Sequence, residues 1–433
     1  MRLSVSLSRL ATICLLAAAL NGCGGGSAAT SAGTVTTPAG AQPPTSQIAV
    51  ADPAQVNLAD GSAIASMADA MVVGGDHIVV RSPSDAAVIV NGNPVHPKTR
   101  LTLLDADGRL VSSTDYGFTL AAGYTGEWLM LPSPDGFLMV QAASGTKMLH
   151  FDKQAKLAGT AMDLYPAVAP TSTTEYAAAE SAGAVDGNGF WLATTFSLLP
   201  ITDKTTYILR LCKFDFSGRQ LTPPFQISSS AVRPQVAAAG GVVLAGWLEG
   251  GGGMLALWPK GAGAPVMHSL TTSGAQPYPV AMTADGKMGV LWNGKATATS
   301  PGGLMGVFVD NAAAPVLDAS RTDLTQESLS ARWGGSLHTS DIDAHTFTSA
   351  LTLASIVNGP LNTGDANQDL VVIGDYGVGA GALSAEPSNV LRFSLSLPLG
   401  DGPVLRQMVF SDHAILLLGN TMRLRAMRVT RKS

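Results

Sequence analysis

The chain has 433 residues, a formal net charge of −5 and 46% hydrophobic against 13% charged residues. This composition supplies enough apolar side chains for a large core and excludes a mainly disordered chain. The acidic balance excludes nucleic acid as a partner, because nucleic-acid binders need clusters of basic residues and here such residues cluster only in residues 423–432. We expect residues 423–432 to form a last strand with one charged, solvated face.

The N-terminus carries a short apolar segment. Residues 10–20, LATICLLAAAL, follow the two basic residues Arg2 and Arg9. A helix that spans a bilayer needs about 20 apolar residues, whereas the apolar region of a cleaved secretion signal needs about 7–15. The length therefore predicts an export signal that is removed.

The segment ends in Leu20-Asn21-Gly22-Cys23. This motif resembles the lipobox of bacterial lipoproteins, in which an apolar residue and small residues precede an obligatory cysteine. The resemblance implies cleavage of residues 1–22 and attachment of lipid, including palmitate-type acyl chains, to the Cys23 thiol. It also implies that the protein lies in the bacterial cell envelope. Gly24, and not aspartate, follows the cysteine, and in this family the absence of aspartate there implies sorting to the outer membrane. An ordinary secretion signal is the alternative.

Residues 23–47 differ in composition from the rest of the chain. After Cys23 they contain no charged and no aromatic residue, so they bury too little apolar surface to offset the entropy of ordering. We interpret them as a lipidated flexible linker that reaches about 25–30 Å, and residues 48–433 as one folded domain. A terminal strand that docks on the domain is the alternative.

Cysteine usage indicates a domain without disulfides. Cys14 leaves with the signal and Cys23 is predicted to carry lipid, so Cys212 has no cysteine to pair with. Cys212 lies in the alternating segment LRLCKFDF. We expect a small buried residue in a strand there, and not a catalytic thiol.

A degenerate repeat runs through the domain. Its copies are apolar strands that end at an acidic or turn residue, with starts 42–62 residues apart: LTLLDADGRL at 101, KMLHFDKQAKL at 147, LRLCKFDFSGRQL at 209, LALWPKGAGAP at 255, MGVFVDNAAAPVL at 305, LTLASIVNGPL at 351 and FSLSLPLGDGPVL at 393. This spacing is typical of propeller blades.

A second set of apolar strands falls between these copies, each after a turn residue, from HIVV after Asp76 to AILLLGN after Asp412. We expect the second set to supply the second strand of each blade and the first set the third. The sequence thus predicts an all-β protein with a single β-propeller, seven-bladed, with six or eight blades as alternatives. A pair of packed β-sandwiches is the alternative fold.

Residues 364–374, GDANQDLVVIG, resemble a shortened form of the calcium loop in integrin-type propeller repeats. The resemblance implies a calcium ion bound by Asp365, Asn367 and Asp369, whose alternate positions present oxygen ligands. The loop lacks the Gly-Asp-Gly step and the last acidic ligand of the family. A plain Asx turn that leads into a strand is the alternative.

A second group of ligand-type residues is His338, Asp341, Asp343 and His345. On a regular strand Asp341, Asp343 and His345 share a face, so they are candidates for a transition-metal site, although their spacing of about 6.5–7 Å is wide for one ion. A polar loop or blade edge is the alternative.

Motifs of hydrolases, zinc proteases and phosphate-binding loops were not found in the sequence. We therefore expect a binding or scaffold module that docks another envelope protein or a glycan, without a cofactor other than calcium. A propeller enzyme of hydrolase or lyase type, with a site in the central channel, is the alternative. The six tryptophans are expected to lie mostly in the core.

Overall fold

The computed structural model describes part of the chain. The described residues are 48–51, 54–58, 67–84, 88–90, 93–95, 98–117, 128–143, 145–166, 176–198, 207–273, 276–281, 286–294, 303–309, 322–323, 338–347, 350–358, 370–377, 389–394, 404–419 and 424–431. All regular elements among them are strands. Within these ranges, no helix is long and apolar enough to cross a membrane.

The first four sheets contain four antiparallel strands each. They are β3 (Asp69–Val73), β4 (His77–Pro83), β7 (Lys98–Asp105) and β8 (Leu110–Gly117); β9 (Trp128–Ser133), β10 (Gly136–Ala143), β11 (Gly145–Asp152) and β12 (Met162–Tyr165); β13 (Tyr176–Asp186), β14 (Gly189–Leu198), β15 (Tyr207–Asp215) and β16 (Phe225–Ser228); β17 (Val232–Ala239), β18 (Val242–Glu249), β19 (Gly252–Trp258) and β20 (Val266–Ser273).

Three further sheets follow in chain order. They are β21 (Tyr278–Ala281), β22 (Met288–Gly294), β23 (Gly303–Val309) and β24 (Thr322–Asp323); β25 (His338–Phe347), β26 (Ala350–Asn358), β27 (Leu370–Gly377) and β28 (Asn389–Ser394); β29 (Val404–Val409), β30 (Ala414–Gly419) and β31 (Leu424–Arg431), with β1 (Ile48–Val50) and β2 (Ala54–Gln55) paired to β31. A hairpin of β5 (Val88–Val90) and β6 (Asn93–Val95) interrupts the first sheet between β4 and β7.

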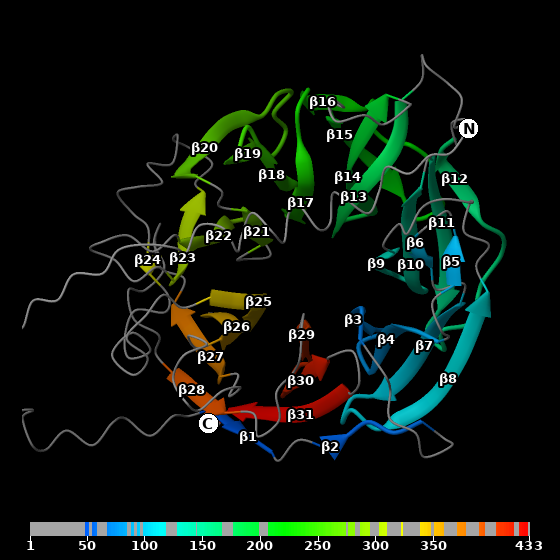
Figure 1. The fold of residues 1–433 in the computed structure, drawn as a ribbon, viewed down its shortest axis with the longest axis vertical. Coiled ribbons are helices and arrows are strands. Elements are labelled where there is room, and N and C mark those ends of the chain that lie inside the picture. The colour runs from blue at the N-terminus through cyan, green and yellow to red at the C-terminus, as the bar shows by residue number, and fades with distance from the viewer. Residues whose placement is uncertain are drawn as a thin grey trace, which may run out of the picture.

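These sheets are arranged in a ring with the first strand of each sheet innermost and the fourth at the rim (Figure 1). The chain is therefore a β-propeller, as the sequence predicts. Successive strands of one sheet are joined by hairpins, and successive sheets pack face to face through apolar side chains. Ile78, Phe137 and Trp247 are among the fully buried residues of these interfaces.

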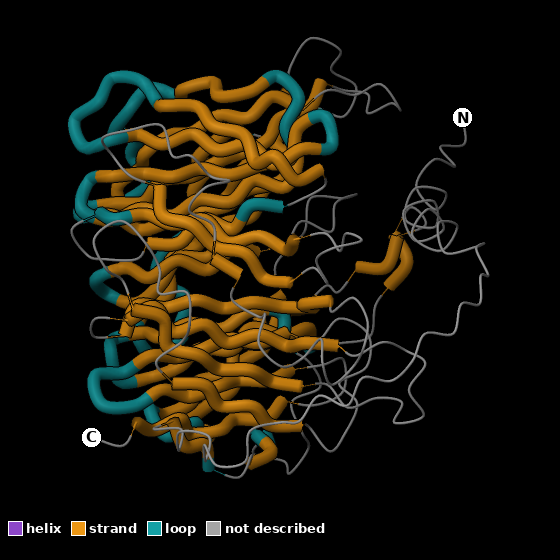
Figure 2. Tube along the Cα trace, turned by 90° about the vertical axis from the view of Figure 1, so that its left-hand side faces the viewer, coloured by secondary structure: helices purple, strands orange, loops and turns teal. Residues whose placement is uncertain are grey.

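The two ends of the ring differ in their connections. Within the sheets, the turns from the first to the second strand and the turns from the third to the fourth strand lie at the same end of the ring, which we call the tight-turn end. Many of the described turns are seen at this end, on the left of Figure 2. The β5–β6 hairpin lies at the opposite end, apart from the ring (Figure 2). Both ends of the folded domain are at the tight-turn end, because Ile48 pairs with Arg431.

The ring is closed by strands from the two ends of the domain. β1 lies outermost in the last sheet, where it pairs with β31, and β2 pairs with the other half of β31. Ile48 and Val56 are 2% and 4% exposed and belong to the apolar clusters at this joint. The sequence predicts the last strand but gives no sign that an N-terminal strand covers it.

The repeats are assigned correctly in five sheets and wrongly in two. The first five copies are the third strands β7, β11, β15, β19 and β23, as expected. The copy at 351 is instead β26, a second strand, and the copy at 393 spans the end of β28 and the start of β29. The first error arises because the two central strands of a sheet are equally apolar and only the pairing distinguishes them. The second error differs, because the copy at 393 joins the last strand of one sheet to the first strand of the next.

Three of the repeats share an aspartate that organises the turn to the fourth strand. Asp105, Asp152 and Asp215 each accept hydrogen bonds at Oδ1 from the amides two and four residues later, at 2.8–2.9 Å. A side-chain oxygen in this position satisfies turn amides that no strand partner reaches. In these three repeats, the aspartate that the sequence pattern identifies as a turn residue therefore stabilises the turn that ends the third strand.

Candidate functional site at the inner strands and the ring joint

The predicted lipid and calcium sites lie outside the described residues. Cys23 precedes the first described residue, and Asp365, Asn367 and Asp369 fall in residues 359–369, between β26 and β27. Lipidation of Cys23 and calcium binding by the three others therefore stay predictions.

The second group of ligand-type residues lies on β25, the innermost strand of its sheet (Figure 1). These residues therefore lie on a strand and not in a loop, and this strand is at the inner edge of a blade, the place that the alternative of a blade edge gives them. Asp341, Asp343 and His345 pair with Ile356, Ala354 and Thr352 of β26, so they share one face as predicted.

A β-bulge adds a fourth residue to this face. The register shifts between Thr339 and Asp341, so that His338 pairs with Asn358, two residues from the partner of Asp341. On an undisturbed strand His338 and Asp341 fall on opposite faces. The bulge places all four residues, His338, Asp341, Asp343 and His345, on one face of the sheet.

The same face of the sheet packs against the last sheet of the ring. Ile373 of β27 lies in line with Asp343 through Ala354, and its side chain belongs to an apolar cluster with Leu405 of β29 and Met427 of β31. β25 and β29 are in contact. The face that carries the four residues is therefore the face directed at β29.

Charged side chains join the last sheet to the first near the inner strands. Arg406 of β29 donates from Nε to Asp69 Oδ1 of β3 over 3.2 Å. Both side chains are about one quarter exposed, so the pair is partly shielded from water. This ion pair connects residues 337 positions apart in the sequence.

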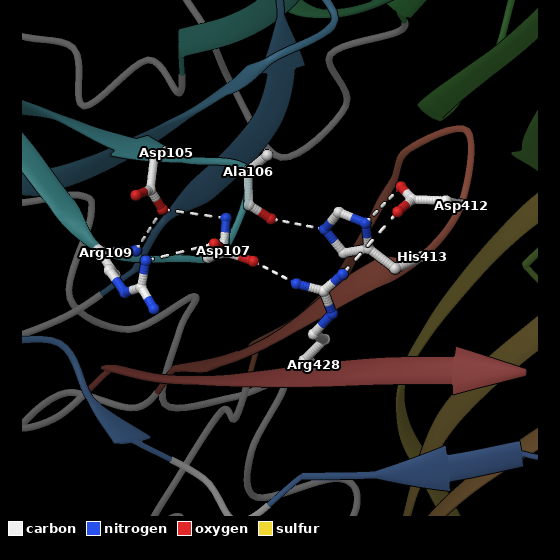
Figure 3. A network of polar contacts seen from close by, with 7 residues as sticks. All are labelled: Asp105, Ala106, Asp107, Arg109, Asp412, His413 and Arg428. Atoms are coloured by element: carbon white, nitrogen blue, oxygen red, sulfur yellow. Dashed lines mark hydrogen bonds and ion pairs between the residues drawn. The ribbon is translucent and has the colours of Figure 1, made fainter.

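A second polar group closes the same joint at the tight-turn end (Figure 3). His413, buried in the turn between β29 and β30, contacts Asp412 Oδ1 through Nδ1 and the Ala106 carbonyl oxygen through Nε2, both at 2.7 Å. Arg428 of β31 pairs with Asp107 and lies 3.8 Å from Asp412 Oδ2. The group thus ties the turn after β7 to the last sheet.

Two paired aspartates, Asp412 at this joint and Asp115 on β8, predict how the stability of the fold depends on pH. The hydrogen bond from His413 lowers the pKa of Asp412, and the hydrogen bond from Arg100 lowers the pKa of Asp115, both from 3.8. A depressed folded-state pKa stabilises the fold above the unfolded value, and this stability is lost as pH falls below 3.8 through the folded value. We expect the urea midpoint to fall as the pH is lowered below about 4. Asp115→Asn should make that fall shallower; an unchanged pH dependence would contradict the assignment.

Another charged pair lies within one sheet on the other side of the ring, and its carboxylate also reaches the next sheet. Lys213 Nζ of β15 lies 3.3 Å from Asp186 Oδ2 and 5.6 Å from the ring centre of Trp191. Asp186 also accepts a hydrogen bond from the Gly241 amide in the next sheet. These charges are matched within the protein, and we interpret them as structural.

Cys212 and most tryptophans lie where the sequence predicts. The Cys212 thiol is fully buried on β15, donates to the Thr222 carbonyl oxygen at 3.1 Å, and has a pKa raised by burial. Trp128, Trp247, Trp258 and Trp292 are buried, whereas Trp191 is half-buried. Trp333 lies outside the described residues. A reactive thiol and a sugar platform built on the buried tryptophans do not fit these positions.

Comparisons with known proteins find distantly similar solved structures and no family. No family model matches the chain, and no curated protein matches it. Among solved structures, the Dos1 propeller is 10% identical with a TM-score of 0.46, covering 86% of this chain and 80% of that one. YCF48 from Cyanidioschyzon merolae is 12% identical with a TM-score of 0.43, covering 81% and 98%. The WD40 domain of SCAP from fission yeast is 8% identical with a TM-score of 0.38, covering 89% and 99%.

Proposed function

We propose that the chain is a lipid-anchored protein of the bacterial cell envelope, directed to the outer membrane by its sorting residue Gly24, and that its propeller serves as a binding or scaffold module. The lipobox Leu20-Asn21-Gly22-Cys23 supports the anchor. The proposed linker ends at Gln47, directly before Ile48, which is the first residue of β1 and lies at the rim and tight-turn end of the ring. An acylated Cys23 would therefore tether a closed ring by its edge.

The observation that carries the binding proposal is the distribution of exposed apolar side chains. Within the described residues, seven large hydrophobic side chains are more than one third exposed. Six of them lie on the fourth, outermost strands of four successive sheets, or, for Leu157, shortly before such a strand: Val111, Leu157, Met162, Phe225, Val266 and Met267. Repeated exposure of apolar side chains at equivalent positions is typical of protein contacts.

This distribution favours a partner protein of the envelope over a glycan. Sugar-binding surfaces present aromatic rings to solvent, and Phe225 is the one aromatic residue among the six. Its ring packs edge-on against Trp258, with 5.6 Å between ring centres. We therefore propose an apolar protein contact along β8, β12, β16 and β20.

Site-specific crosslinking tests the binding proposal. A photo-crosslinking residue at Phe225 or Met267, in full-length chain expressed in its membrane, should give an adduct with an envelope protein. The same residue at Lys153 or Lys260, exposed at the tight-turn end, is the control and should give markedly less. Equal adducts at all four positions, or none at the rim, would argue against the rim contact.

The anchor is tested separately. Mass spectrometry of the mature chain should show a new N-terminus at Cys23 that carries fatty acid. Cys23→Ser should release a folded chain into the soluble envelope fraction with an unchanged melting temperature. An intact N-terminus without acyl chains would overturn the anchor and leave the crosslinking result unaffected.

A further inference from the structure

The inner strand of the fourth sheet carries a strained arginine. Within the described residues, only Ala155 and Arg233 combine a side chain with a positive φ, of 57° and 55°. Ala155 lies in the turn after β11, at the place that Gly218 takes in the turn after β15. Arg233 is the second residue of β17 and belongs to no such turn. Long side chains rarely adopt this backbone conformation, and such outliers are typical of functional sites.

A β-bulge accompanies this conformation. The pairing of β17 with β18 shifts register between Val232 and Gln235, and bulges of this kind redirect the side chains beside them. β17 is the innermost strand of its sheet and begins at the end of the ring opposite to the tight turns (Figure 1). Arg233 therefore lies at the inner edge of the ring, at that opposite end.

Groups from the two neighbouring sheets hold the backbone of Arg233. Glu180 of β13 accepts a hydrogen bond at Oε2 from the Arg233 amide over 2.7 Å. Gln276, two residues before β21, donates from Nε2 to the Arg233 carbonyl oxygen over 3.0 Å. Among the described residues, the buried Oε1 atom of Gln276 has no hydrogen-bond partner. The fold thus accepts a strained φ and an unsatisfied acceptor at one place, costs that are typically retained for function.

The side chain of Arg233 is available to a ligand. It is exposed, and within the described part of the chain its guanidinium makes no hydrogen bond and no ion pair. Glu180 is also exposed, but its carboxylate binds the amide of Arg233 and not the guanidinium. The positive and the negative group are therefore presented next to each other without neutralising each other.

Three exposed side chains at this place offer three kinds of contact. The guanidinium of Arg233 can bind a carboxylate through two parallel hydrogen bonds. Glu180 Oε1, which has no partner among the described residues, can accept a hydrogen bond from an N–H group. Val232, which is 38% exposed, offers apolar surface. A carboxylate, an N–H group and an apolar side chain occur together at the C-terminus of a peptide.

We propose that Arg233, Glu180 and Val232 bind the C-terminus of a peptide whose last residue is apolar. Arg233 binds the terminal carboxylate, Glu180 accepts the N–H group of the last residue, and Val232 contacts its side chain. Doubly charged phosphate fits less well, because the Glu180 carboxylate repels it more strongly. The inference rests on the proposed binding role of the propeller, but the site is on inner strands, apart from the rim contact along β8, β12, β16 and β20.

The test uses full-length protein in detergent and dye-labelled tetrapeptides that end in Val, Leu, Ile or Phe, followed by fluorescence anisotropy. At least one peptide with a free C-terminus should bind, and its C-terminal amide should bind at least tenfold more weakly. Arg233→Gln should weaken binding of the free acid at least tenfold. Arg219→Gln removes another arginine, with a side chain 76% exposed, at the tight-turn end. It is the matched control and should bind as the wild type does.

Arg233→Gly separates binding from stability. Glycine adopts a φ of +55° without steric strain, so this variant should melt at or above the temperature of the wild type. It should nevertheless lose peptide binding at least tenfold. A clear drop in melting temperature together with unchanged binding would show that Arg233 has only a structural role.

Further results would overturn the proposal. One is the absence of binding by all four peptides to wild-type chain that melts cooperatively. Another is equal binding of the free acid and the amide, or equal losses in Arg233→Gln and Arg219→Gln. Hexanoate or inorganic phosphate that competes as well as the unlabelled peptide would replace the peptide terminus by a simpler anion. Crosslinks at Phe225 or Met267 without any peptide binding would overturn this site and leave the rim contact in place.

Discussion

Deletion of residues 48–58 is expected to lower the stability of the propeller by about 5 kcal/mol or more. The deletion removes β1 and β2, exposes the outer edge of β31, and takes Ile48 and Val56 out of the core. Each buried aliphatic side chain contributes about 1.5–3 kcal/mol, and each lost backbone hydrogen bond about 1 kcal/mol. Urea unfolding followed by fluorescence of the buried tryptophans measures the change.

A deletion of equal length in the predicted linker, residues 29–39, is the control for this experiment. It should leave the urea midpoint where it is in the full chain. A chain without residues 48–58 that unfolds at the same midpoint would show that the ring does not depend on its N-terminal strands.

Gly189→Ala is expected to destabilise the domain by about 3 kcal/mol or more. A Cβ atom at Gly189 would lie 2.0 Å from the carbonyl oxygen of Phe214 on the paired strand β15. This oxygen belongs to the backbone and cannot rotate away, so the strands would have to separate. Overpacking typically costs about 1–3 kcal/mol, and a clash with a fixed backbone atom lies at or above the upper end of this range.

Gly187→Ala, in the same hairpin, is the matched control. Gly187 has a φ of +63°, and no atom lies within 4 Å of the position that a Cβ atom would take there. Alanine at this position therefore meets only the left-handed backbone penalty of about 1–2 kcal/mol. Thermal unfolding of both variants compares the two costs. Equal losses would contradict the close approach of β14 and β15.

The repeat pattern was sufficient to predict the propeller because it is local. Three of the third strands end at a turn that Asp105, Asp152 or Asp215 stabilises within five positions of the chain. The assignment fails in the last two copies, and in the copy at 351 the strand order is wrong. Pairing between β26 and β27 distinguishes second from third strand, and hydropathy does not carry that information.

The joint of the ring and the place of His338 on the shared face of β25 could not be predicted for a different reason. β1 has three residues, Ile48–Val50, too few for a periodic pattern. His413 and Arg406 contact residues more than 300 positions away. The bulge that brings His338 onto the face of Asp341 leaves no mark such as glycine, because Ser340 occupies it.

The pairing of Ile48 with Arg431 also bears on how freely the order of the chain can be rearranged. A short peptide that joined these neighbouring positions would make the domain continuous, and a new start and stop could be introduced elsewhere. The turn at Gly250 and Gly251, exposed and without neighbours at either Cβ position, is the natural place. In such a circular permutant the last sheet would be formed from one uninterrupted stretch of sequence.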